Sequence, residues 1–184
     1  NYLDLLGKNP LISFPKFGVI NLHPAPLPAF KGCAGYNLAI LNKYTEWSIT
    51  AHYMNHSIDE GRIIKELNFP IDPKNETAFS LEAKSQLHID ILYKDIVDMV
   101  IKNGILDSKE NKGGRYFSRA QMEEMKEIKY GDDIDTKIRA FWFPPYDGAY
   151  VEIDGKNYTL VNHSVLEQVN GDSEAIFRHT QIGS

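Results

Sequence analysis

The first predicted core element is a short apolar strand near the start of the chain. Residues 17–23 read Phe-Gly-Val-Ile-Asn-Leu-His and are bounded by Pro15 and Pro24. A nearly continuous apolar run of this length is typical of a strand that is buried on both faces, as in a parallel sheet. We therefore expect residues 17–23 to belong to the sheet of an α/β domain.

Further apolar periodicities follow this strand. Residues 35–41 carry apolar side chains at helical spacing, after a proline-rich and therefore stiff loop. Strands are predicted at residues 47–54 and 62–71, with a turn at residues 55–61 between them. These elements complete the first half of the predicted domain.

A long amphipathic helix is predicted at residues 78–103, with Thr77 as its N-cap. Its apolar positions recur in steps of three or four: Leu81, Leu87, Ile91, Leu92, Ile96, Met99 and Val100. Gly104 ends the pattern and divides the chain into residues 1–105 and residues 106–184.

The second half of the chain has a different pattern of apolar and polar residues. Helices are predicted at residues 119–128 and around residues 134–140. Residues 149–153 and 157–161 flank an Asp-Gly pair and predict a β-hairpin with a two-residue turn. The sequence thus predicts an α/β core followed by a helical and β-hairpin extension.

Composition narrows the classes of function. The net charge is −5 and the isoelectric point is about 5.7, which argues against nucleic acid as the main partner. Cys33 is the single cysteine, so disulfides within the chain and cysteine-rich metal sites are excluded, and the reducing cytoplasm fits. The sequence has no apolar run near the length of a membrane span. A small-molecule partner is the better hypothesis.

Three polar residues are candidates for chemistry. Asn21 and His23 are two apart at the end of the first strand, so their side chains lie on one face. In a parallel sheet this point would lie beyond the carboxyl ends of the strands, where such sheets bind ligands. Asp59 follows the next strand and would place a carboxylate beside the imidazole.

These residue types fit acyl transfer between two nitrogens. A histidine can remove and return the amine proton, and an asparagine amide can donate to a developing oxyanion. The carboxylate would orient the imidazole and raise its pKa. A polar trio by itself is also typical of unrelated caps and turns.

The surrounding motifs are more specific. Residues 21–28 read Asn-Leu-His-Pro-Ala-Pro-Leu-Pro, residues 30–32 read Phe-Lys-Gly, and residues 58–64 read Ile-Asp-Glu-Gly-Arg-Ile-Ile. Together they resemble the signature of the formyltransferases that use 10-formyltetrahydrofolate. The resemblance implies a Rossmann-like core, 10-formyltetrahydrofolate as co-substrate, and a catalytic triad of Asn21, His23 and Asp59.

The carboxy-terminal region indicates the branch of this family. Residues 137–150, which read Lys-Ile-Arg-Ala-Phe-Trp-Phe-Pro-Pro-Tyr-Asp-Gly-Ala-Tyr, resemble the tail of the nucleotide-sugar N-formyltransferases. Residues 106–184 are more acidic than basic, unlike the basic barrel of the transfer-RNA branch. The resemblance implies a nucleotide-linked, dTDP-type amino sugar as acceptor, and a role in lipopolysaccharide O-antigen biosynthesis.

Several side chains are candidates for holding that acceptor. Aromatic residues could stack on a base and cationic ones could meet a pyrophosphate. The candidates are Phe141, Trp142, Phe143, Tyr146, Arg139, Lys137, Lys31 and His52. Packing under the hairpin explains the aromatic residues equally well, a core role suits His52 better, and Lys31 could equally lie in solvent. The hairpin edge could also pair with a second subunit and form a homodimer.

Other interpretations stay open. The histidines near Asp59 lack metal-motif spacing, so no metal is expected. Complete members of the family would have further βα units before residue 17, so residues 1–105 would be the carboxy-terminal portion of the catalytic domain and residues 106–184 the extension for substrate binding and dimerisation. A formyltetrahydrofolate hydrolase, another formyltransferase branch, or an inactive binding and dimerisation module are the alternatives.

Overall fold

The computed structural model describes residue 12 and residues 14–171 of the 184-residue chain. Different segments of the chain form two compact units. Unit 1 consists of Asn1–Gly35, Glu46–Pro70 and Glu82–Arg119, and unit 2 consists of Tyr36–Thr45, Ile71–Leu81 and Ala120–Ser184.

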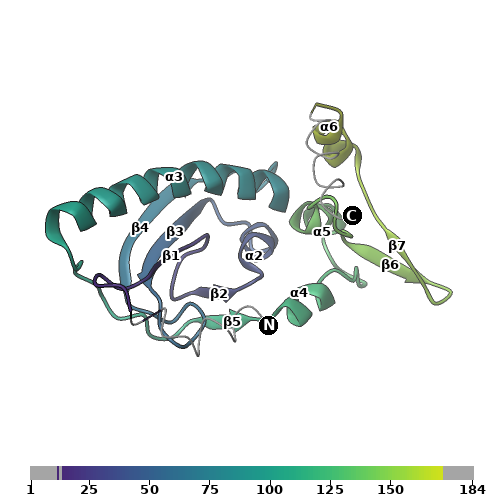
Figure 1. The fold of residues 1–184 in the computed structure, drawn as a ribbon. Helices are drawn as coiled ribbons and strands as arrows, with labels where there is room; N and C mark the ends of the chain where they lie inside the picture. Colours follow the sequence, from purple (N-terminus) through teal and green to yellow (C-terminus); the bar gives the residue numbers. More distant parts are fainter. Residues whose placement is uncertain (1–11, 13, 172–184) are drawn as a thin grey trace, which may run out of the picture. The chain divides into compact units, whose positions relative to one another are not determined.

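The described part of the chain contains the predicted strands and helices, together with two short strands and a last helix that were not predicted (Figure 1). The strands are β1 (Ile20–His23), β2 (Phe30–Gly32), β3 (Glu46–Tyr53), β4 (Ile63–Pro70), β5 (Arg115–Phe117), β6 (Tyr150–Ile153) and β7 (Lys156–Thr159). The helices are α2 (Gly35–Leu41), α3 (Ala78–Asn103), α4 (Arg119–Glu124), α5 (Ile134–Phe141) and α6 (His163–Gly171).

Unit 1 contains a three-stranded sheet in the order β1-β3-β4, and both pairings are antiparallel. The parallel sheet predicted for these strands is therefore wrong. The apolar runs reflect burial rather than strand direction, because β3 is central and six of its consecutive residues are buried. Residues of α3 lie along this sheet, where the His88 ring stacks on Phe69 at 4.0 Å between centroids and Lys65 pairs with Asp95 at 2.7 Å (Figure 1).

The first strand is shorter than predicted. The chain turns at residues 15–18, where the Gly18 N–H donates to the Pro15 carbonyl at 2.9 Å. Gly18 has φ 78°, a left-handed conformation that glycine adopts without strain. Strand β1 consequently begins at Ile20 rather than residue 17, although the Val19 carbonyl still accepts the Met54 N–H at 2.8 Å.

The sequence pattern did not predict β2 and β5, which pair in parallel over three residues each. Strands this short carry no readable alternation. The two strands pack so closely that a Cβ on Gly32 would lie 2.3 Å from the Phe117 carbonyl oxygen. This pairing fixes the backbone of Gly32, which faces the site described below.

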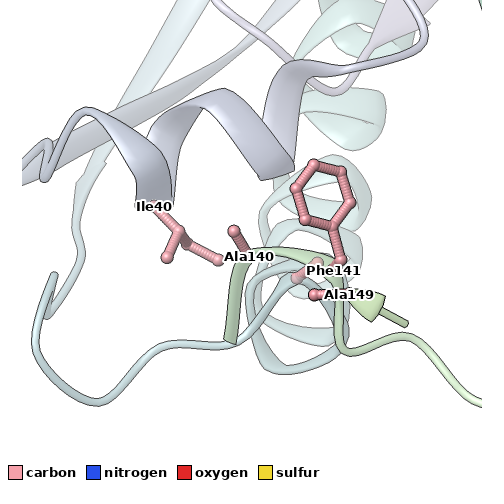
Figure 2. Close-up of a cluster of buried hydrophobic side chains, with 5 residues drawn as sticks. Ile40, Ala140, Phe141 and Ala149 are labelled. Atoms are coloured by element: carbon pink, nitrogen blue, oxygen red, sulfur yellow. The ribbon is translucent and has the colours of Figure 1, made fainter. Parts of the chain in front are cut away.

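Unit 2 is built around a small apolar core (Figure 2). Its buried members come from α2, the first turn of α3, α5 and the start of the hairpin: Ile40, Ala78, Ala140, Phe141 and Ala149. The predicted Thr77 cap is confirmed, since its hydroxyl accepts from the Ser80 N–H at 3.0 Å. The predicted hairpin is confirmed as β6–β7.

Two helices of unit 2 differ from their predicted ranges. Helix α5 covers the predicted residues 134–140 and one more, with Asp133 as N-cap. Helix α4 ends at Glu124 rather than residue 128, because Glu127 forms a bridge with Tyr150 and Ile128 donates to the Tyr150 carbonyl at 2.7 Å. A helical backbone cannot make these bonds, so tertiary pairing overrides local propensity.

Candidate active site

The register of β1 against β3 adds a second histidine to the predicted trio. Asn21 lies opposite His52 in the antiparallel ladder, and directly opposed residues project to the same face of a sheet. The Asn21 Nδ2 donates to His52 Nε2 at 3.1 Å. Three of the predicted residues, Asn21, His23 and His52, thus share one side of unit 1.

The His23 ring is 5% exposed and is held between two acceptors. Its Nε2 lies 2.8 Å from the Phe30 carbonyl oxygen, so this nitrogen carries a proton and donates. Its Nδ1 lies 3.5 Å from Asp59 Oδ1. A neutral His23 therefore has its lone pair at Nδ1, and uptake of a proton there would place the new charge beside the carboxylate.

Burial lowers the pKa of His23 and outweighs Asp59 and the Phe30 carbonyl, which both raise it. The predicted raising effect of the carboxylate on this pKa is confirmed, although the net shift is downward. The desolvation of a nearly inaccessible imidazole is the larger effect. The neutral imidazole, which is the form that can accept a proton, is favoured at neutral pH.

Asp59 lies in the loop between β3 and β4 and turns back toward β1. Its Oδ2 accepts the Gly32 N–H at 2.9 Å, and its Oδ1 lies 3.7 Å from His52 Nε2. Burial alone would raise the pKa of Asp59, but the nearby His52 and His23 rings and the Gly32 N–H together lower it. Asp59 is therefore an anion between two imidazoles.

His52 is 2% exposed and lies beside Asn21 on the neighbouring strand. Its Nδ1 lies 2.9 Å from the Tyr53 carbonyl oxygen and must donate to it. In the neutral ring Nε2 then has no hydrogen and accepts from Asn21. This bond fixes which end of the Asn21 amide faces His52, and it leaves the second N–H of Nδ2 for another acceptor.

Lys31 is also buried, with 6% of its surface exposed, rather than a free surface lysine. Its Nζ lies 3.3 Å from Glu60 Oε1, in the loop that carries Asp59. Lys31 directly precedes Gly32, whose N–H donates to Asp59. Lys31 thus lies at the site, while its contact with an acceptor stays a prediction.

The predicted acceptor-binding residues of the carboxy-terminal region belong to unit 2. Phe141 is buried in the core of unit 2, and the guanidinium of Arg139 donates to the carbonyls of Pro73 and Glu76, both at 3.0 Å. These contacts stabilise unit 2, and a ligand would have to displace them. Tyr146 is 60% exposed, and its ring lies 6.0 Å from that of Phe143.

The other predicted acceptor-binding residues of unit 2 are Trp142, Phe143 and Lys137. Trp142 and Phe143 are partly exposed, and Phe143 packs against Phe79 at 5.9 Å between centroids. Lys137 pairs with Asp132 at 2.6 Å. Of the aromatic candidates, Tyr146 is exposed, Trp142 and Phe143 are half-buried, and Phe141 is buried.

Sequence reasoning missed Asn111. Its Nδ2 donates to the backbone carbonyls of Asp59, at 2.8 Å, and Gly61, at 2.9 Å. A single asparagine in a polar loop, 52 residues away from its partner, gives no sequence signal.

Within the described ranges, no group of three or more His, Cys, Asp and Glu side chains is arranged to hold a metal ion. None of the helices in the described part of the chain has the length and apolarity needed to span a membrane.

A mixed α/β unit that brings an amide, two imidazoles and a carboxylate to one sheet face defines a site suited to acid–base group transfer. The family model described as Formyl transferase matches residues 1–95, slightly more than half of the chain, and includes every residue of this site except Asn111. The chain belongs to the formyl transferase family, as its motifs predicted.

Curated relatives come from two branches of the family. The methionyl-tRNA formyltransferase of Geobacter sulfurreducens is 25% identical, with 90% of this chain and 52% of the relative covered. The GDP-perosamine N-formyltransferase of Brucella melitensis is 29% identical, with 80% of this chain and 57% of the relative covered. The chain thus spans about half the length of the curated relatives that it matches.

Solved structures confirm the predicted α/β fold class. A 4-N formyltransferase from Francisella tularensis matches with a TM-score of 0.68 and 27% identity, covering 78% of this chain and 61% of that one. An N-formyltransferase from Helicobacter canadensis, in complex with folinic acid and dTDP-3-aminofucose, matches with a TM-score of 0.64 and 28% identity. That match covers 76% of this chain and 52% of the neighbour.

Proposed function

We propose that the protein transfers a formyl group from 10-formyltetrahydrofolate to the amino group of a nucleotide-linked, dTDP-type amino sugar. The observation that carries the proposal is the cluster of Asn21, His23 and Asp59 within a chain of the formyl transferase family. The folate is the co-substrate, and folinic acid in the Helicobacter canadensis neighbour supports that choice.

The reaction requires one proton to move between two nitrogens. The sugar amine attacks the formyl carbon, and the carbonyl oxygen becomes an oxyanion. The second N–H of Asn21 Nδ2 donates to this oxygen. His23 removes the amine proton and returns it to N10 of the folate as the bond between N10 and the formyl carbon breaks.

Asp59 stabilises the charge that His23 acquires during this cycle. Its Oδ1 lies 3.5 Å from the Nδ1 that takes up the proton, and its own low pKa keeps it ionised. The interaction is stronger with imidazolium than with imidazole, so it lowers the energy of the intermediate more than that of the resting state. Asp59 therefore acts as the orienting and charge-stabilising member of the triad.

Charge favours a sugar nucleotide over transfer RNA as the acceptor. The chain has a net charge of −5, and RNA binding requires a basic surface. The GDP-perosamine relative and the dTDP-3-aminofucose neighbour support this branch. In this proposal Tyr146 and Trp142 stack on the base, Lys31 meets an anionic group, and the β6–β7 hairpin contributes to a homodimer in the cytoplasm.

The test is an acceptor panel with the full-length protein and 10-formyltetrahydrofolate. The panel contains dTDP-linked amino sugars, a GDP-linked amino sugar and methionyl-tRNA, and mass spectrometry detects the formylated product. We expect formylation of a dTDP-linked amino sugar. His23→Ala should lower turnover by about 10²–10⁴-fold, while His163→Ala at an exposed helix position should not.

Other results would point elsewhere. Formylation of methionyl-tRNA alone would overturn the choice of acceptor but not the reaction. Formate released at the same rate with and without an amine would identify a hydrolase. Binding of dTDP in the absence of folate binding or turnover would identify an inactive nucleotide-binding module.

A further inference from the structure

The loop that carries Asp59 has an unusual backbone that needs external support. Asp59 has φ 53°, in the left-handed region that side chains other than glycine adopt infrequently. Two residues later, a Cβ on Gly61 would lie 1.5 Å from the Tyr53 carbonyl oxygen, so the loop is pressed against the end of β3. Small changes in this loop would therefore move the Asp59 carboxylate.

Asn111 supplies this support through both hydrogens of one amide nitrogen. The Nδ2 donates to the Asp59 carbonyl at 2.8 Å and to the Gly61 carbonyl at 2.9 Å, and the residue is 9% exposed. Two carbonyl oxygens can be satisfied only by the NH₂ end, so the chemistry fixes the orientation of the amide. The Asn111 side chain thereby joins residues 59 and 61 at a constant separation.

The segment that presents Asn111 is itself anchored on both sides. Before it, Lys109 and Ile63 exchange backbone hydrogen bonds of 2.8 and 2.9 Å. After it, the Arg115 N–H donates to the Ala29 carbonyl at 3.3 Å, and a Cβ on Gly114 would lie 1.5 Å from the Pro28 carbonyl oxygen. Asn111 is thus held in place independently of the loop that it supports.

We propose that Asn111 is a positioning residue for Asp59, which holds the carboxylate at the distance from His23 that formyl transfer requires. The inference rests on the proposed function, since it assigns Asp59 a part in that reaction. Asn111 lies outside residues 1–95, the part of the chain that the family model matches. The segment after α3 is therefore part of the catalytic apparatus.

The first test is kinetic, in the full-length protein. Asn111→Ala should lower kcat by about 10–100-fold and change KM for the folate by less than about 3-fold, because a misplaced catalytic group loses rate rather than affinity. In an Asp59→Asn background the same change should have almost no further effect. Equal losses in both backgrounds would overturn the proposal, and Asn103→Ala, at an exposed position at the end of α3, should match the wild type.

The second test does not depend on turnover. The His23 ring is titrated by NMR in the wild type and in Asn111→Ala, and the pKa should fall in the variant because Asp59, which raises it, moves away. An unchanged His23 titration would overturn the proposal even if no acceptor is ever found.

If Asn111→Ala does not fold at the assay temperature, Asn111→Asp replaces it in the double-mutant kinetics, since it keeps the volume and loses both donors.

If the wild-type protein formylates no acceptor, the proposed function fails, while the titration still decides whether Asn111 positions Asp59. If the wild-type protein is active and both tests on Asn111 are negative, the inference fails and the proposed function stands.

Discussion

His23 and Asp59 form a pair in which burial and charge act against each other. Burial favours neutral His23, whereas the adjacent carboxylate favours its protonated form. The neutral state leaves the lone pair at Nδ1, where an incoming proton would lie 3.5 Å from Asp59. A base in this setting is available at neutral pH and still has its conjugate acid stabilised, which is the balance that general base catalysis requires.

This balance predicts the pH dependence of the proposed formyl transfer. In the proposed mechanism the base is neutral His23, so activity should persist as the pH falls until it passes through the lowered pKa of His23. The acid limb of kcat/KM should therefore lie below the usual histidine range. In Asp59→Asn the raising effect is lost, so the limb should shift to still lower pH while kcat falls by about 10²-fold or more.

The measurement is kcat/KM against pH for both proteins at constant ionic strength. A limb that moves to higher pH in Asp59→Asn would show that the carboxylate does not stabilise protonated His23.

The residues of the site differ in how far the sequence could predict them. Asn21, His23 and Asp59 stand in compact motifs that resemble those of a known family, so they could be found without the fold. The hydrogen bond that Asn21 donates to His52 depends on antiparallel register, which the apolar pattern does not encode. The bond from Asn111 to Asp59 depends on a loop 52 residues away, and nothing local distinguishes that asparagine.

At the scale of elements, the connection between β3 and β4 determines the geometry of the site. The Tyr53 N–H donates to the Arg62 carbonyl at 2.9 Å, which closes the loop just where Gly61 touches β3. Glycine is thus required at position 61 because the backbone of β3 leaves no room for a side chain. The backbone angles of Gly61 do not require it. This tight closure brings Asp59 back over the sheet.

Gly61→Ala should therefore open the loop. The new Cβ would lie 1.5 Å from the Tyr53 carbonyl oxygen, and backbone rather than a flexible side chain must move. We expect a loss of about 1–3 kcal/mol in the free energy of unfolding, the usual cost of overpacking, together with a fall in kcat. Urea unfolding and turnover measure the two effects.

Gly148→Ala is the matched control, because its Cβ would lie 3.5 Å from the nearest atom, an ordinary contact. Equal stability of the two variants would contradict the close approach at Gly61.

Elements with a strong local signal were predicted well. The bounds of α3 and the Asp-Gly turn of the hairpin depend on local features, and the turn has positive φ at both positions, 51° and 74°. The predicted apolar stripe of α3 is only partly confirmed, because Leu87 and Ile91 are 67% and 50% exposed and lie outside its buried face. Strand direction and the β2–β5 pair were not predictable, since both depend on which distant segments meet. An apolar run reports that a strand is buried, and it carries no information on its neighbours.

At the scale of the whole molecule, the chain passes between the two units five times, after Gly35, Thr45, Pro70, Leu81 and Arg119. Three of these passages lie inside helices, within α2, α3 and α4. A helix is cooperative along its length, so the unfolding of one unit removes hydrogen bonds from a helix of the other. The connectivity of the chain therefore links the stabilities of the two units.

We expect the two units to unfold in one transition. Trp47 reports on unit 1 and Trp142 on unit 2, so Trp47→Phe and Trp142→Phe each leave one tryptophan as a probe of a single unit. In each variant, urea unfolding followed by tryptophan fluorescence should coincide with unfolding followed by far-ultraviolet circular dichroism. Comparison within one variant removes the effect of the substitution itself on stability. A fluorescence transition that separates from the circular dichroism transition in either variant would show that the shared helices do not couple the units.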